Sequence, residues 1–95
     1  MVVTDIELPR LVVDEEPIHI RFESEIMVVV SAMGYAAAAF VIKTKTKKRY
    51  YILLGAKSLC QQLEVVRRSN NGSLLGVEVW IRKDGPDKTA KYIVE

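Results

Sequence analysis

Apolar and polar positions change their period along the chain, and these changes predict the secondary structure. Ile18, Ile20 and Phe22 alternate with polar neighbours, which is the period of a strand with one buried face. Residues 26–30 form a continuous apolar run, which predicts a strand covered on both faces. Gly34 follows this run and predicts a turn or a bulge.

A hairpin is predicted next, with its two strands at residues 35–46 and 49–54. The two-residue loop between them has no Asn-Gly or similar sequence, so the alternation of side chains alone sets the expected register. That register places Tyr50 opposite Lys45, so that a ring and a cation share one face.

An amphipathic helix is predicted over residues 56–69, where apolar side chains recur every three or four positions. This stripe includes Cys60, which we therefore expect to be a small buried hydrophobe and not a reactive thiol. Ser58 and Gln61 match a capping box if the helix begins at Ser58. The sequence Asn-Asn-Gly at residues 70–72 predicts its end.

A second hairpin is predicted around the turn sequence Asp-Gly-Pro-Asp at residues 84–87. A four-residue loop there pairs Val79 with Tyr92 and makes one face entirely apolar. The same register turns Trp80 to the opposite face and places Lys91 directly across from it.

In this order the elements predict an α+β domain. We expect a small antiparallel sheet or partly open barrel of about five or six strands, with the helix between the third and fourth main strands. The order resembles that of an OB-fold barrel, and a sheet covered by one helix is an equal alternative. The domain is expected over residues 18–95, preceded by an acidic segment at residues 1–17 that forms an edge strand or an arm.

Charge is unevenly distributed, although the net charge is only +2. Residues 1–25 contain seven acids and two arginines, a net charge of −5, whereas residues 26–95 carry twelve bases and five acids, a net charge of +7. Either the two regions neutralise each other, or the basic region meets an anionic partner.

The sequence contains no recognisable enzyme or metal-site pattern. Its one histidine, His19, lacks a partner ligand and is expected on the solvent face of its strand, and the glycines do not form a phosphate loop. The single cysteine excludes an internal disulfide and favours a reducing, cytoplasmic location. No apolar run approaches the ~20 residues of a membrane span, and the first residues do not resemble a signal peptide. We expect no catalysis, cofactor, metal or membrane.

Two clusters of cations and aromatic rings predict nucleic-acid binding. Residues 43–49 contain five cations and precede Tyr50, and Trp80 lies among charged residues on a predicted outward face. Cations neutralise phosphates and rings stack on bases. The predicted interface comprises Lys43, Lys45, Lys47, Lys48, Arg49, Tyr50, Trp80, Arg82 and Lys91.

We therefore expect a module that binds single-stranded DNA or RNA with weak sequence specificity. The alternative is a protein-interaction or homodimerisation module without a nucleic-acid role. The lysine-rich tip is also compatible with simple protection of a sheet edge. The orientation of Trp80 separates these functions, because the indole is open to a ligand, buried by the helix, or covered by a second subunit.

Overall fold

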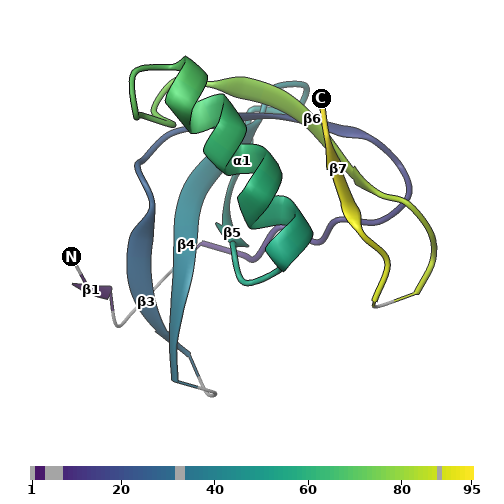
Figure 1. Cartoon of the computed structure of the whole chain (residues 1–95), viewed down its shortest axis with the longest axis horizontal. Helices are drawn as coiled ribbons and strands as arrows, with labels where there is room; N and C mark the ends of the chain where they lie inside the picture. Colours follow the sequence, from purple (N-terminus) through teal and green to yellow (C-terminus); the bar gives the residue numbers. More distant parts are fainter. Residues whose placement is uncertain (1, 4–7, 32–33, 88) are drawn as a thin grey trace.

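A computed structural model describes residues 2–3, 8–31, 34–87 and 89–95. These residues form, in chain order, β1 (Val2–Val3), β2 (Ile18–Phe22), β3 (Met27–Ser31), β4 (Gly34–Lys43), β5 (Arg49–Leu53), α1 (Lys57–Ser69), β6 (Glu78–Lys83) and β7 (Tyr92–Val94). The predicted α+β class is confirmed, and α1 lies across one face of the sheet (Figure 1). The acidic residues Asp5 and Glu7 of the predicted N-terminal segment lie outside the described residues.

The sheet is built around β4, the longest strand, and it is not closed in the described part of the chain. Its strand order is β1-β3-β4-β2-β6-β7, with β5 paired to the other edge of β4. Among the strands of the described residues, β1 runs parallel to β3, and the other paired strands are antiparallel. The pairing of β2 with β6 determines the site described below, because it joins segments that are distant in the sequence.

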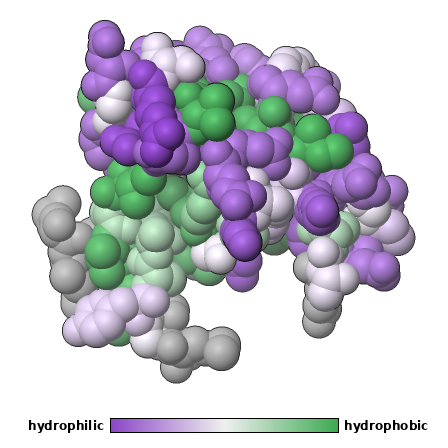
Figure 2. Space-filling view, viewed as in Figure 1, coloured by the Kyte–Doolittle hydropathy of each residue, from purple (hydrophilic) through white to green (hydrophobic). Residues whose placement is uncertain are grey.

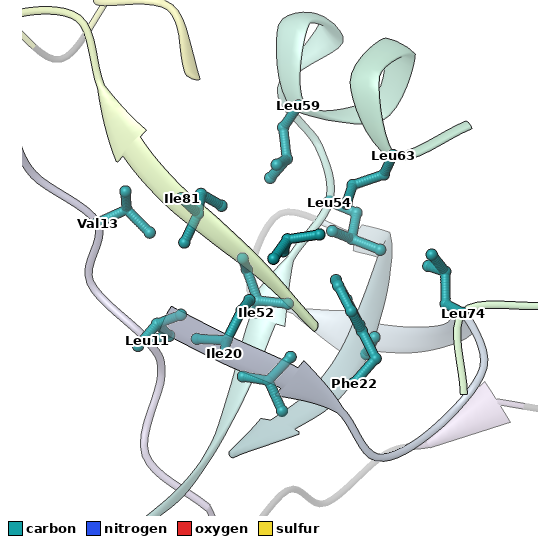
Figure 3. Packing of buried hydrophobic residues seen from close by; sticks show 13 residues of the cluster. Leu11, Val13, Ile20, Phe22, Ile52, Leu54, Leu59, Leu63, Leu74 and Ile81 are labelled. Atoms are coloured by element: carbon teal, nitrogen blue, oxygen red, sulfur yellow. The ribbon is translucent and has the colours of Figure 1, made fainter. Parts of the chain in front are cut away.

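The main core lies between the sheet and α1. Alternation in β2 buries Ile20 and Phe22 completely, as the sequence predicts. Figure 3 shows Leu59 and Leu63 pointing from the helix toward the sheet, where Leu54 meets them. This face of the sheet is therefore closed to ligands beneath the helix.

Part of the N-terminal segment packs onto this core. Pro9 and Leu11 flank Tyr51 of β5, with hydrogen bonds from Leu11 N to Tyr51 O (2.8 Å) and from Tyr51 N to Pro9 O (3.0 Å). Leu11 and Val13 are buried with the main core. Residues 9–13 are thus held against the domain by both backbone pairing and apolar contact.

A second, smaller cluster occupies the other face of β4 and consists of Met27, Val29 and Ala38. The predicted coverage of residues 26–30 on both faces is wrong. Val28 and Val30 alternate with the buried positions and remain 39% and 46% exposed, because β3 extends past the helix (Figure 1). The apolar run therefore behaves as a strand with one buried face.

The helix begins two residues earlier than a capping box at Ser58 would require. Its N-cap is Ala56, which makes no side-chain capping bond, so the predicted box is not formed. Ser58 Oγ instead accepts a hydrogen bond from Tyr92 N (3.1 Å), and Gln62 bonds to Tyr92 O (2.6 Å) and Val94 N (2.8 Å). These side chains satisfy the outer edge of β7 and protect it from pairing with another strand.

The predicted end of the helix is confirmed, and the predicted burial of Cys60 is wrong. The helix stops at Ser69, and the amides of Asn70 and Gly72 both donate to Arg67 O. Cys60 is exposed on the flank of α1, where its thiol donates to Leu54 O. It lies at the margin of the apolar stripe and not at its centre.

Both predicted hairpin registers are wrong by four residues, and in the second hairpin the predicted apolar face, with Val79 and Ile81, is nevertheless buried. Tyr50 lies opposite Val41 instead of Lys45, and Val79 is not opposite Tyr92, whose partner is Lys83. A slip by an even number of residues leaves every side chain on its original face, so alternation does not detect it. The loops decide the register.

Each of the two loops is longer than the predicted turn and has its own backbone hydrogen bonds. In the first, Lys47 adopts a left-handed conformation (φ 61°) and donates from its amide to Lys43 O (2.8 Å). In the second, Asp84 N donates to Lys91 O (2.9 Å), and the amide of Ala90 donates to Asp87 O (3.0 Å). The predicted residue Lys88 of this loop lies outside the described residues.

Glu25 connects the segment between β2 and β3 to the segment after the helix. One carboxylate oxygen accepts hydrogen bonds from Leu74 N (2.7 Å) and Leu75 N (3.2 Å). These bonds, chiefly the one from Leu74, hold the pKa of the Glu25 carboxyl below its ordinary value of 4.5. The folded state thus favours the ionised carboxylate.

This shift predicts an acid-sensitive contribution to stability. The contribution is complete above pH 4.5 and is lost as the pH falls through the depressed folded-state pKa, because protonation then becomes more favourable in the unfolded chain. Glu25→Gln should therefore flatten the acid limb of the unfolding free energy, measured by urea denaturation at several pH values. The control is Glu23→Gln, whose carboxylate bonds to Arg21 at the surface. Equal acid limbs for wild type and Glu25→Gln would contradict the expectation.

Candidate nucleic-acid interface

Trp80 lies on the outer face of β6, away from the helix. Its neighbours Val79 and Ile81 are buried in the main core, whereas Trp80 is 50% exposed. This alternation confirms the predicted outward orientation of the indole. Burial of Trp80 beneath the helix, one of the alternatives left open by the sequence, is excluded.

His19 holds one side of the indole. The pairing of β2 with β6 places His19 opposite Trp80, and their ring centroids are 4.9 Å apart with an interplanar angle of 48°. His19 Nδ1 is 2.6 Å from Thr44 Oγ1, and its Nε2 is 3.8 Å from a Glu78 carboxylate oxygen. The hydrogen bond to Thr44 therefore holds one end of the imidazole, and the ring restricts the orientation of the indole.

The role of His19 was not visible in the sequence. The alternation in β2 correctly placed it on the outer face, but its contact with Trp80 depends on pairing between strands separated by most of the chain. The sequence could have indicated this contact only together with the strand pairing, because two outward-facing aromatic rings become neighbours once β2 and β6 are known to pair.

Two hollows border Trp80, and we call them together the Trp80 groove. The larger, about 400 Å³, is lined by Val12, Asp14, Glu16, Pro17, Ile18, His19, Lys43, Lys45, Thr46 and Trp80. The smaller, about 280 Å³, is lined by Pro17, Trp80, Arg82, Ile93 and Glu95. Four of the predicted interface residues thus line the Trp80 groove: Lys43 and Lys45 line the larger hollow, Arg82 the smaller, and Trp80 both.

Lys91 is not opposite Trp80, which corrects the prediction. Because β7 pairs four residues later than expected, the backbone of Glu95 occupies that position and exchanges two 2.9 Å hydrogen bonds with Trp80. Lys91 instead lines a separate hollow of about 700 Å³ beside the start of α1, together with Lys57. It therefore lies outside the Trp80 groove.

Tyr50 also lies away from the groove. It pairs with buried Val41, and its ring packs partly buried against the main core. Lys43 Nζ is 4.9 Å from the centre of this ring and forms a cation–π contact, whereas the predicted register placed Lys45 opposite Tyr50. Lys47, Lys48 and Arg49 are exposed in and beside the loop that precedes β5.

Acidic and basic side chains share the larger hollow. Asp14 and Glu16 line it together with Lys43 and Lys45, yet the described residues form no ion pair between these two sets of charges. Asp14 is held in place, because its Oδ1 accepts from Glu16 N (2.9 Å) and its carbonyl accepts from Lys83 N (2.7 Å). The groove can thus offer both cations and hydrogen-bond acceptors to a ligand.

The described residues contain no group of three or more His, Cys, Asp or Glu side chains placed to hold a metal ion. Within the same described ranges, no helix combines the length and apolar character needed to cross a membrane. Comparison with known proteins matches the chain to no family model, no curated protein and no solved structure.

Proposed function

We propose that this domain binds single-stranded DNA or RNA in the Trp80 groove, with weak sequence specificity and without catalysis. The observation that supports the proposal is a half-exposed indole in a groove that Lys43, Lys45 and Arg82 also line. The indole offers a stacking surface for a base, and each base stacked on a ring contributes about 1–3 kcal/mol. These cations carry the charge needed to neutralise neighbouring phosphates.

The contact between His19 and Trp80 limits how much can bind. The imidazole covers part of the indole, so we expect the remaining indole surface to accept one base. The exposed loop cations, Lys47 and Lys48, extend the positive border beyond the groove. A single cysteine is compatible with the reducing cytoplasm, where we place the protein.

The salt dependence of binding tests this proposal. The logarithm of the association constant for a single strand falls with the logarithm of salt concentration by about 0.7 for each phosphate contact. The double variant Lys45→Gln/Arg82→Gln should therefore reduce the slope by about 1.4, measured by anisotropy of a labelled oligothymidylate.

A matched control removes the same charge elsewhere. Lys57→Gln/Lys91→Gln alters the hollow beside α1 and should leave the slope unchanged. Salt-insensitive binding, no binding at low salt, or an equal loss in both double variants would contradict the proposed interface.

Self-association is a second candidate function, favoured by a different surface. Figure 2 shows a hydrophobic area over β3 and β4, where Ile26, Val28, Val30 and Tyr35 are exposed. Exposed apolar patches of this kind commonly contact other proteins. Light scattering across protein concentrations separates the two functions, because a dimer formed through β3 and β4 persists in Trp80→Ala whereas oligonucleotide binding does not.

A further inference from the structure

The acidic wall of the Trp80 groove is unexpected for a surface that binds only phosphates. Asp14 and Glu16 line the same hollow as Lys43 and Lys45, and a carboxylate repels a phosphate. An ionised carboxylate has only acceptor oxygens, so it binds groups that carry N–H or O–H donors. In a nucleic acid, the bases provide such donors, as does the 2′-hydroxyl of RNA.

The two acids differ in their freedom to bind a ligand. Asp14 Oδ1 is already used by Glu16 N, and Lys83 N fixes the backbone of the same turn. The Glu16 side chain is exposed, and within the described part of the chain its carboxylate accepts no hydrogen bond. Pro17 follows it and restricts its backbone to extended conformations. Asp14 therefore positions the turn, and Glu16 presents two free acceptor oxygens.

The bases differ in what they offer to such a carboxylate. The Watson–Crick edge of guanine has two adjacent donors, N1–H and N2–H, which match the two carboxylate oxygens. Adenine and cytosine present one amino donor next to an acceptor nitrogen, and thymine and uracil present one N–H between two carbonyls. These other bases place an acceptor against a carboxylate oxygen, which is repulsive.

We infer that Glu16 selects guanine for the base stacked on Trp80. The inference rests on the proposed function and refines it, because stacking and phosphate contacts accept every base whereas the Glu16 carboxylate distinguishes them. The position of Glu16 supports this role, because Glu16, Pro17 and Trp80 line the same hollow.

The test uses oligothymidylates of about ten nucleotides that carry one central guanine, adenine or cytosine, or none. The wild-type protein should bind the guanine strand about five- to a hundredfold more tightly than the others, the range expected for a bidentate contact to a base edge. Glu16→Gln should abolish this preference and favour adenine or cytosine, because an amide presents one donor and one acceptor.

Glu15→Gln is the matched control. Glu15 is the adjacent exposed acid and does not line either hollow, so its loss changes the net charge equally and should preserve the guanine preference. If Glu16 only repels phosphate, Glu16→Gln will tighten all strands by the same factor, which would overturn the inference.

The outcomes also separate this inference from the proposed function. Equal wild-type affinity for all four strands, lost in Trp80→Ala, would leave the nucleic-acid proposal standing and overturn guanine selection. Absence of binding to every strand would overturn both. A comparison of guanosine monophosphate with the guanine strand tests whether the ligand is a nucleic acid or a free nucleotide. Tighter binding of the strand supports a nucleic acid. Tighter binding of the free nucleotide would overturn the assignment of the groove to a nucleic acid.

Discussion

Trp80→Ala is expected to weaken oligonucleotide binding by about five- to a hundredfold, which corresponds to the ~1–3 kcal/mol of one base stacked on an aromatic ring. The indole is half-exposed, and His19 already restricts its orientation before a ligand arrives. A ring that is fixed in advance loses little conformational entropy on binding, so most of the stacking energy is available for affinity. Anisotropy of a labelled strand measures the change without depending on tryptophan fluorescence.

Two further variants distinguish stacking from general loss of apolar surface. Trp80→Phe keeps an aromatic face and should retain most of the affinity. Leu75→Ala removes another exposed apolar side chain, one that does not line the groove, and should bind like the wild type. Wild-type affinity in Trp80→Ala, with thermal unfolding unchanged, would mean that the indole does not contact the strand.

The orientation of Trp80 was predictable because it depends on local alternation. Val79 and Ile81 are apolar and are buried in the core. Because side chains alternate along a strand, Trp80 between them then faces outward, whichever strand β6 pairs with. The position of Lys91 was not predictable in this way. It depends on the register between β6 and β7, and a slip of four residues changes which residue faces Trp80 without changing any buried side chain.

Long-range pairing limited the prediction of the groove in the same way. Lys43 and Lys45 were recognised by their charge, but their position beside Trp80 follows from the pairing of β2 with both β4 and β6. The acidic turn at Asp14 joined the groove through a backbone hydrogen bond from Lys83, for which the sequence carries no pattern. Local periodicity therefore predicted which side chains of a strand face the core, and tertiary contacts determined which outward-facing side chains became neighbours.

The largest effect on folding is expected from Phe22→Ala. Phe22 is completely buried, and Figure 3 shows its ring beneath the helix near Leu54 and Leu74. Truncation of a buried phenylalanine typically costs about 3–5 kcal/mol, because apolar contact is lost and a cavity remains. Domains of this size have a total stability of about 5–15 kcal/mol, so this variant should lose much of its stability or fail to fold.

Phe40→Ala provides a matched comparison within the same sheet. Phe40 is only partly buried and packs against the small cluster on the opposite face of β4, so its truncation should cost less than half as much. Phe22→Leu keeps most of the buried volume and allows measurement if the alanine variant does not fold. Urea denaturation should show lower midpoints with an unchanged slope, with the lowest midpoint for Phe22→Ala and the next for Phe40→Ala.

Equal losses of stability for the two alanine variants would mean that the two faces of β4 contribute equally to the stability of the fold. The face under α1 would then not be the main source of stability.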